Sequence, residues 1–300
     1  MNSPPTTVGW LGTGRMGSAM AGRLLAAGTP VTVWNRTTAK TAPLIDQGAG
    51  LAESIGDLAA CDVVFVMVST PKDLIQVVSG PQGLLRAPQV PAFIVDCSTV
   101  NPETSAQVRA AAGARGTQFL ACPISGNPHV VADGGAVIMA SGPPQAFDSV
   151  KPLLEQIAKA AIWVGEAEQA RLVKICHNLY LGLLVQSLSE VTVLAEKSGV
   201  PRAAFLDFLN STVLASPWVQ NRTPDLVALD WTPTFTSELL RKDFDLGLAA
   251  ARTAEVPVPL VAQVHQRIQE TIARGHRDDD FLSLFLVQAE SAGMEIEAAK

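Results

Sequence analysis

Residues 7–34 read TVGWLGTGRMGSAMAGRLLAAGTPVTVW, and this stretch decides the fold of the first half of the chain. A short apolar run, Thr7–Leu11, is followed by the glycine-rich turn GTGRMG, a helical pattern over Met16–Ala27 and a second apolar run, Pro30–Trp34. A Gly-x-Gly-x-x-Gly motif between a strand and a helix, with a second strand at this spacing, is typical of dinucleotide binding. The stretch therefore predicts the first β-α-β unit of a Rossmann fold.

Each glycine of the turn has a physical task in this prediction. Gly12 permits the tight turn, Gly14 lets a pyrophosphate approach the backbone, and Gly17 lets the helix pack closely on the strand. The first turn of the helix, at Arg15 and Met16, lies at the positive end of the helix dipole, which attracts phosphate. We expect these five residues to bind the cofactor.

The end of the second predicted strand indicates which cofactor is bound. An acid usually stands here and binds the ribose 2′-hydroxyl of NAD, whereas this chain has Asn35, Arg36 and Thr37, with Lys40 close behind. No carboxylate at this place repels a 2′-phosphate, and the guanidinium can bind one. We therefore expect a preference for NADP. The alternative is that Arg36 and Lys40 are ordinary solvated residues that open a helix.

Further apolar runs continue the sheet, and helical patterns such as Pro102–Ala114 lie between several of them. Continuous apolar runs that alternate with helices indicate a mostly parallel sheet covered on both faces. We predict an α/β fold, in which an N-terminal Rossmann doubly wound sheet is followed by an all-α C-terminal domain. The further runs are Asp62–Val68, Ala92–Asp96, Gln118–Ala121, Ala136–Ala140 and Ile162–Val164.

Three segments follow predicted strands, at the edge of the sheet where such folds bind their ligands. Their hydroxyls and glycines can bind a nicotinamide amide or a substrate carboxylate. Turn and capping chemistry explains the same residue types equally well for any one segment. The segments are Val68–Pro71, which contains Ser69; Asp96–Pro102, which contains Thr99; and Cys122–Asn127, which contains Ser125 and Gly126.

The stretch from Gly165 to Ser198 predicts a long helix. Apolar residues surround its whole circumference from Leu172 onward, and Lys174 is the one formal charge between Leu172 and Ser189. A helix that is apolar all round is normally buried. A membrane span is the alternative, but the window is barely long enough and holds several polar side chains. We therefore favour a buried core helix.

Lys174 and Asn178 are spaced i, i+4 in this helix, so they share one face. Apolar surroundings disfavour the charged form of a lysine and make it available for proton transfer. The plainer alternative is a lysine whose ammonium group reaches water near the start of the helix.

The strand pattern stops after Gly165, and only helical stretches follow. We predict two domains, an NADP-binding Rossmann domain over 1–165 and an all-helical substrate and oligomerisation domain over 166–300. The long helix is too apolar to stand alone, so we expect it to pack against the sheet domain and another subunit. The later helical stretches are Pro201–Ser211, Ser237–Ala254, Pro259–Arg274 and Phe281–Ser291.

Composition argues against several classes of function. The 300 residues are 48% hydrophobic and 17% charged, which is typical of an ordered globular protein. A net charge of −6 without any basic run argues against nucleic-acid binding. The four cysteines are dispersed without a C-x-x-C pair, so we expect no structural metal and a reducing, cytoplasmic location. The start, MNSPPTTVGW, lacks the pattern of a secretory signal.

Together these motifs resemble the β-hydroxyacid dehydrogenase family, which includes 3-hydroxyisobutyrate dehydrogenases and glyoxylate or succinic semialdehyde reductases. The resemblance covers nearly the whole chain. After the glycine-rich turn, the matching motifs are D-x-S-T-x-x-P at Asp96–Pro102, an altered S-G-G substrate loop at Ser125-Gly126-Asn127, G-x(8)-K-x-x-x-N at Gly165, Lys174 and Asn178, and the K-D pair Lys242-Asp243.

The resemblance implies NADP-dependent hydride transfer between the nicotinamide and a small 3-hydroxy acid, semialdehyde or keto acid. It implies Lys174 as the general acid/base and Asn178 as a residue that places the substrate. The family commonly forms a homodimer or homotetramer. Further roles that the resemblance implies are substrate binding at Ser125, Gly126 and Asn127, and cofactor binding at Thr99 and Lys242. Val68 and Ser69 are expected to bind the cofactor because they follow a predicted strand.

Two alternatives remain open. The stretch VTVWNRTTAK also resembles imine reductases of the same fold, which typically lack a lysine at the position of Lys174. The other alternative is a non-catalytic NADPH-binding module, against which the intact pair Lys174 and Asn178 argues. Asn127 replaces a glycine of the family pattern and Ala121 replaces its usual acid. Both changes lie where substrate specificity is set.

Overall fold

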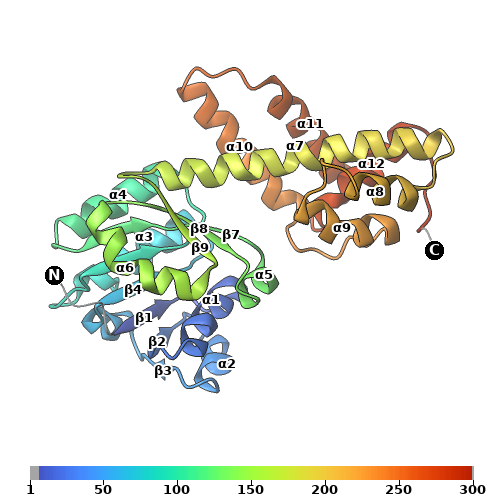
Figure 1. The fold of residues 1–300 in the computed structure, drawn as a ribbon. Coiled ribbons are helices and arrows are strands. Elements are labelled where there is room, and N and C mark those ends of the chain that lie inside the picture. The colour runs from blue at the N-terminus through green and yellow to red at the C-terminus, as the bar shows by residue number, and fades with distance from the viewer. Residues whose placement is uncertain (1–6, 299–300) are drawn as a thin grey trace. The chain divides into compact units, whose positions relative to one another are not determined.

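The computed structural model of the chain describes residues 7–298, and most of the segment interpreted as lacking a secretory signal lies outside this range. The chain divides into two compact units, Met1–Lys174 and Ile175–Lys300. The division falls inside helix α7 (Gln169–Lys197), whereas the sequence suggested a boundary near Gly165. Among the residues described, the strands belong to the first unit and the second unit is helical (Figure 1).

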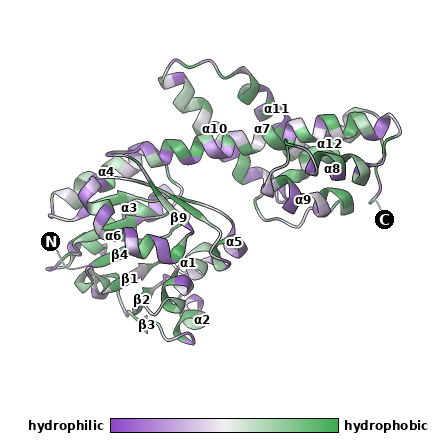
Figure 2. Ribbon diagram, in the orientation of Figure 1, coloured by the Kyte–Doolittle hydropathy of each residue, from purple (hydrophilic) through white to green (hydrophobic). Residues whose placement is uncertain are grey.

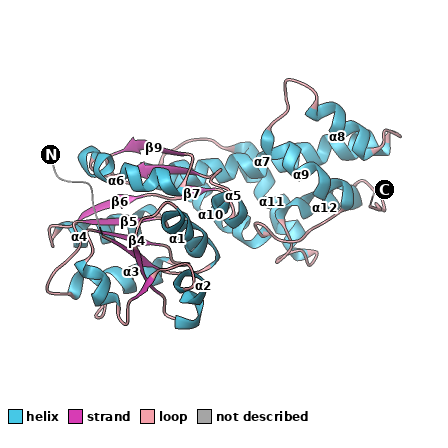
Figure 3. Cartoon of the chain, turned by 60° about the horizontal axis from the view of Figure 1, so that its bottom comes forward, coloured by secondary structure: helices cyan, strands magenta, loops and turns pink. Residues whose placement is uncertain are grey.

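The first unit is built on one sheet, which has nine strands in the part of the chain that the structure describes (Figure 3). The strand order is β3-β2-β1-β4-β5-β6-β8-β7, and β9 pairs with β8. The β6–β8 and β7–β8 pairs are antiparallel and the other pairs are parallel. The chain reverses its direction of winding at β1, as in the predicted Rossmann sheet. The strands are β1 (Val8–Leu11), β2 (Val31–Trp34), β3 (Gly50–Leu51), β4 (Val63–Val66), β5 (Phe93–Asp96), β6 (Gln118–Ala121), β7 (Ile124–Ser125), β8 (Val137–Ser141) and β9 (Ala160–Gly165).

Helices cover both faces of this sheet. They are α1 (Arg15–Ala26), α2 (Ala42–Ile45), α3 (Pro71–Ser79), α4 (Pro102–Gly113), α5 (Pro128–Ala132) and α6 (Pro144–Ile157), with the 3₁₀ helices η1 (Thr38–Thr41), η2 (Ile55–Ala60) and η3 (Leu84–Arg86). Neighbouring residues of β4 enter different apolar cores: Phe65 packs with Met20 of α1, and Val64 packs with Leu74 of α3. Strands buried on both faces read as continuous apolar runs, and Figure 2 shows hydrophobic residues along them.

The second unit packs its helices around a third apolar core. Two glycines let α7 and α10 approach closely, because a Cβ atom on Gly182 would lie 2.5 Å from Cε2 of Phe244, and one on Gly247 would lie 2.6 Å from Cδ1 of Leu179. After α7, the elements are α8 (Arg202–Asn210), α9 (Pro217–Ala228), α10 (Ser237–Thr253), α11 (Pro259–Ala273), η4 (Phe281–Ser283) and α12 (Leu284–Ser291).

Helix α7 is not buried all round within the single chain, and the predicted packing of its remaining apolar surface against another subunit stays a prediction. Leu188 faces the core of the second unit, whereas Tyr180 and Leu194 are 67% and 68% exposed. A helix presents only part of its circumference to one packing partner, so the other apolar residues turn outward. By length and composition α7 is also the one described helix that could cross a membrane, and 50% of its apolar window is buried in the protein.

Candidate cofactor and active site

The glycine-rich turn between β1 and α1 is held by close packing of the backbone. Gly12 has a φ of +99°, and a Cβ atom on it would lie 2.1 Å from the carbonyl oxygen of Met67. A Cβ atom on Gly17 would lie 2.0 Å from the carbonyl oxygen of Gly12. Both positions therefore require glycine, and packing within the protein is the reason.

Gly14 is different, because packing does not explain it. Its φ of −69° and ψ of −177° suit any residue, and a Cβ atom on it would meet no described heavy atom within 4 Å. Gly14 is the N-cap of α1, where no described side chain caps the helix and the first turn holds no acid. Arg15 is exposed and Met16 is half-buried in that turn. An uncapped helix N-terminus beside an open glycine suits a bound phosphate group.

A pocket of about 480 Å³ lies where β1, β2 and β4 end. Leu11, Trp34 and Met67 mark these strand ends in its lining, and Ile55 and Val77 add apolar surface. The carboxyl edge of a parallel sheet is where doubly wound folds bind their ligands. The pocket brings together eight residues that the sequence predicted to bind a cofactor: Gly12, Gly14, Asn35, Arg36, Thr37, Lys40, Val68 and Ser69.

The other predicted cofactor residues do not line this pocket. Arg15, Met16 and Gly17 belong to α1, where Gly17 is buried. Thr99 is half-buried in the segment after β5, and Lys242 belongs to α10 of the second unit.

Asn35 ties two loops of the pocket together. Its Oδ1 accepts a hydrogen bond of 3.0 Å from the backbone N–H of Thr13, and its Nδ2 donates one of 2.9 Å to the carbonyl oxygen of Thr37. The hydroxyl of Thr13 donates in turn to the carbonyl oxygen of Lys40 at 3.1 Å. The amide of Asn35 therefore shapes the wall of the pocket through contacts within the protein.

A carboxylate does lie beside Arg36, which corrects the expectation that this place holds none. Nη1 of Arg36 lies 3.0 Å from Oδ1 of Asp73, a residue of α3 that also lines the pocket. A hydrogen bond from the hydroxyl of Thr70 and, secondarily, the contacts with Arg36 hold the pKa of Asp73 below its usual value. The local stretch after β2 gave no sign of this acid, because Asp73 follows β4 instead.

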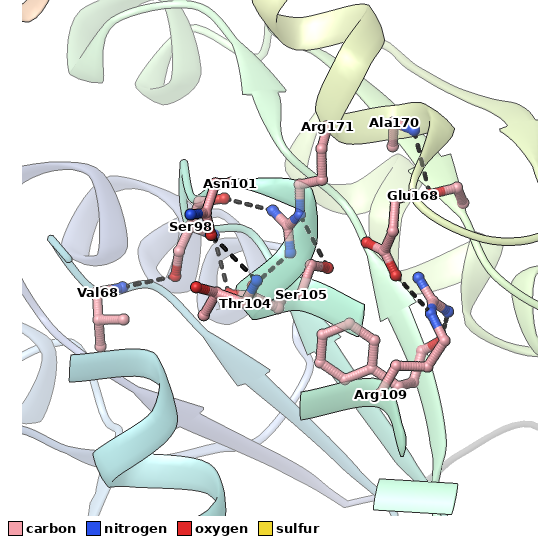
Figure 4. Close-up of polar contacts among 12 residues, drawn as sticks. Val68, Ser98, Asn101, Thr104, Ser105, Arg109, Glu168, Ala170 and Arg171 are labelled. Carbon is pink, nitrogen blue, oxygen red and sulfur yellow. Dashed lines mark hydrogen bonds and ion pairs between the residues drawn. The ribbon is translucent and has the colours of Figure 1, made fainter. Parts of the chain in front are cut away.

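Arg171 forms a buried polar cluster at the start of α7 (Figure 4). Its side chain is 1% exposed and is paired with the fully buried carboxylate of Asp96 at the end of β5. Arg171 also donates to the backbone carbonyl oxygen of Ser98, and its Nε donates to the hydroxyl of Ser105 at 3.2 Å. A buried guanidinium with these partners fixes the first turn of α7 to the edge of the sheet.

The same cluster reaches the loop after β4. The hydroxyl of Ser98 accepts a hydrogen bond of 3.0 Å from the backbone N–H of Val68, and the backbone N–H of Ser98 donates to Oδ1 of Asp96 at 3.0 Å. Lys174 lies three residues after Arg171, is half-buried and ends the first compact unit. Arg171 therefore links the strand ends that carry Val68 to the turn that precedes Lys174.

Two cysteines near this cluster are unsuited to nucleophilic chemistry. Burial raises the pKa of the Cys122 thiol to about 12. Burial, together with Cys122 and Asp96, raises the pKa of Cys97 well above its usual value. Both thiols are therefore protonated at neutral pH. The described residues contain no group of three or more His, Cys, Asp or Glu side chains arranged to hold a metal.

The predicted substrate loop follows β7. Ser125 is half-buried, and Gly126 has a φ of +140°. Asn127 is the N-cap of α5, where its Oδ1 accepts a hydrogen bond of 3.0 Å from the backbone N–H of Val130. Pro128 then occupies the first position of the helix. The departure from glycine at Asn127 thus has a local reason, which is capping of the next helix.

Asn178 lies in the second unit and is 4% exposed. Its Nδ2 donates a hydrogen bond of 2.6 Å to Oδ2 of Asp243 on α10, and its Oδ1 lies 2.9 Å from Nδ1 of His177. Nζ of Lys242 lies 3.6 Å from the other oxygen of Asp243. The close packing of α7 and α10 brings these groups together. The sequence pointed to the pair Lys242-Asp243 but assigned no task to Asp243, whose carboxylate orients the Asn178 amide.

Two known protein families match consecutive parts of the chain. Residues 7–165 match the family described as the NAD-binding domain of 6-phosphogluconate dehydrogenase. Residues 169–287 match the family described as "NAD-binding of NADP-dependent 3-hydroxyisobutyrate dehydrogenase".

Two similar curated proteins each match more than 90% of this chain, but this chain covers very different shares of their own lengths. Glyoxylate/succinic semialdehyde reductase 1 of Arabidopsis thaliana is 31% identical over 275 residues, which are 91% of this chain and 95% of that protein. The cytokine-like nuclear factor N-PAC of Xenopus tropicalis is 30% identical over 279 residues, which are 93% of this chain and 52% of N-PAC. The chain therefore spans about half the length of the N-PAC proteins.

Solved structures show the same likeness. A 3-hydroxyisobutyrate dehydrogenase from Salmonella typhimurium is 26% identical with a TM-score of 0.82, over 94% of this chain and 99% of that one. Psf3, solved with NADP+ and 2-OPP, is 28% identical with a TM-score of 0.82, over 93% and 99%. An imine reductase from Myxococcus stipitatus, at 22% identity and a TM-score of 0.60 over 95% and 100%, shares the fold alone.

Proposed function

The chain belongs to the β-hydroxyacid dehydrogenase family, and on this premise we propose that it is an NADP(H)-dependent oxidoreductase of a small 3-hydroxy acid, semialdehyde or keto acid. The nicotinamide, when bound, supplies or accepts the hydride. The observation that carries the proposal is the pocket of about 480 Å³ at the strand ends, in which eight predicted cofactor residues meet.

The residues of the first unit fit a dinucleotide. The uncapped N-terminus of α1 and the open face of Gly14 suit a pyrophosphate. Arg36 and Lys40 line the same pocket and suit a 2′-phosphate, which is the basis for proposing NADP(H) over NAD(H). In this proposal Arg15, Met16, Thr37, Val68, Ser69 and Thr99 contribute further cofactor contacts.

Lys174 is the proposed general acid/base. It would donate a proton to the carbonyl oxygen of the substrate during reduction and remove the hydroxyl proton during oxidation. Acid–base catalysis of this kind contributes typically about 10²- to 10⁴-fold to a rate. The roles of Asn178 in placing the substrate and of Lys242 in binding the cofactor rest on the motif resemblance.

The loop Ser125-Gly126-Asn127 is the proposed site for the substrate carboxylate. The hydroxyl of Ser125 and the backbone of Gly126 can donate hydrogen bonds to a carboxylate. The amide of Asn127 is occupied in capping α5, so it would contribute through the position of the loop. The first domain would bind the cofactor, and the helical domain would serve the substrate and the assembly of a homodimer or homotetramer in the cytoplasm.

Turnover of a substrate panel tests the proposed function. The chain would be mixed with NADPH and small semialdehydes, keto acids or cyclic imines, and the loss of nicotinamide absorbance would be followed. We expect turnover with carboxylate-bearing semialdehydes or keto acids. Turnover with cyclic imines alone would identify an imine reductase, and tight NADPH binding without any turnover would identify a non-catalytic module.

A further inference from the structure

The rim of the cofactor pocket carries an ion pair between two segments that are distant in sequence. Arg36 follows β2 and Asp73 lies in the first turn of α3, and both residues line the pocket. Nη1 of Arg36 and Oδ1 of Asp73 are 3.0 Å apart. The guanidinium proposed to bind a 2′-phosphate therefore already has an anionic partner within the protein.

The two partners are held unequally. The Arg36 side chain is 76% exposed, whereas the Asp73 side chain is 22% exposed. Oδ2 of Asp73 accepts a hydrogen bond of 2.7 Å from the hydroxyl of Thr70, and the backbone N–H of Asp73 donates to that hydroxyl at 3.1 Å. Asp73 is thus the fixed member of the pair, and Arg36 is the member that can move toward a ligand.

A fixed carboxylate here acts on the two cofactors in opposite ways. Its negative charge lies close to any 2′-phosphate that Arg36 binds, and like charges repel. The same carboxylate can accept a hydrogen bond from the ribose 2′-hydroxyl of NADH, which is the task of the acid that many NAD sites carry after the second strand. This chain has Asn35 at that place, and the amide of Asn35 is engaged with Thr13 and Thr37.

We propose that Asp73 is a specificity-determining residue of this pocket, which moderates the preference for NADPH and supports binding of NADH. The inference rests on the proposed function of the pocket as a dinucleotide site. Asp73 pairs with Arg36 when no 2′-phosphate is present, and Arg36 exchanges that partner for the phosphate when NADPH binds. The chain therefore uses both cofactors, with a smaller discrimination than Arg36 alone would give.

The substitution Asp73→Asn tests this proposal. Asparagine keeps an oxygen that can accept from Thr70, and the hydroxyl of Thr70 still caps α3, but the negative charge is lost. The matched control is Asp57→Asn. Like Asp73, Asp57 is an acid in the first turn of a helix; it is exposed and accepts a hydrogen bond of 2.8 Å from the backbone N–H of Ser54. Asp57 does not line the cofactor pocket.

The dissociation constants of NADPH and NADH would be measured for the full chain and both variants by nicotinamide fluorescence, with melting temperatures recorded to verify folding. We expect Asp73→Asn to raise the ratio of the NADH constant to the NADPH constant by about two- to five-fold, the range for a single exposed ion pair. We expect Asp57→Asn to leave the ratio unchanged. An unchanged or lower ratio in Asp73→Asn would overturn the inference while leaving the proposed function intact. Failure of the unmodified chain to bind either cofactor would instead overturn the proposed function, and the inference with it.

Discussion

Nδ2 of Asn178 donates a hydrogen bond of 2.6 Å to the carboxylate of Asp243, and the two residues are only 4% and 2% exposed. Only the amide nitrogen can donate to a carboxylate, so this bond fixes which way the Asn178 amide faces. Two helices of the second unit approach closely enough for the bond because Gly182 and Gly247 carry no side chain. A residue proposed to place the substrate is therefore oriented by a buried acid on another helix.

Replacing that acid should impair turnover more than cofactor binding. In Asp243→Asn the amide can present either its oxygen or its nitrogen to Asn178, so the orientation is no longer fixed. We expect kcat to fall about tenfold, which corresponds to about 1.4 kcal/mol and matches the loss of one buried hydrogen bond. Asp245→Asn is the control, because Asp245 is exposed on the same helix. Equal losses in both variants would show that the Asp243 carboxylate does not position Asn178.

The buried pair of Arg171 and Asp96 should be needed for stability. Arg171→Met leaves the Asp96 carboxylate buried without its cation, and breaking such a pair costs about 3–5 kcal/mol. Urea unfolding would measure this loss against Lys151→Met, which removes an exposed i, i+4 pair with Glu155 and should cost less than about 1 kcal/mol. Similar free energies of unfolding for the two variants would contradict the importance of the cluster.

Arg36→Ala should weaken NADPH selectively. The substitution removes a charge-assisted contact to the 2′-phosphate, a group that NADH lacks. The dissociation constant of NADPH should rise about tenfold or more, as expected for a hydrogen bond to a charged group, while that of NADH changes little. Titration of both cofactors checks this, and equal losses for both would speak against the assignment of Arg36.

Ser125→Ala should distinguish acid substrates from uncharged aldehydes. If the hydroxyl binds the substrate carboxylate, KM for semialdehyde acids should rise about tenfold, because a hydrogen bond to a charged group is lost. KM for an uncharged aldehyde of similar size should stay nearly constant. Steady-state kinetics with both substrates gives the answer, and the same rise for both would mean that Ser125 only shapes the loop.

Most of the sheet could be predicted because its signals are local, but the two-residue strands β3 and β7 were not predicted. β4 is apolar at every position since both of its faces are buried, and the glycine-rich turn marks where the first helix begins. Helix α9 is absent from the predicted helical stretches, and its segment contains two prolines, Pro217 and Pro224. Pro217 occupies the first position, which tolerates proline, and Pro224 lies inside the helix, where single-sequence rules predict a break.

The candidate site was predictable only where its residues are close in sequence. Most of the predicted cofactor residues lie in two short stretches, residues 12–17 and 35–40, so the glycine motif and the end of the second strand reveal them. In three interacting pairs the two residues lie far apart in sequence. The separation is 37 residues for Arg36 and Asp73, 65 for Asn178 and Asp243, and 75 for Asp96 and Arg171. Spacing along one chain does not indicate which distant charges meet, because that depends on how the elements pack.

The central claim is that Lys174 transfers the proton, and kcat of two variants tests it most directly. Lys174→Ala should lower kcat by at least about 10² while NADPH affinity stays nearly intact, because acid–base catalysis is removed and cofactor binding is not. Lys174→Arg should also be nearly inactive, because a guanidinium stays protonated across the working pH range and cannot act as a base. Melting temperatures of both variants would exclude unfolding as the cause. A fully active Lys174→Arg protein would contradict the account.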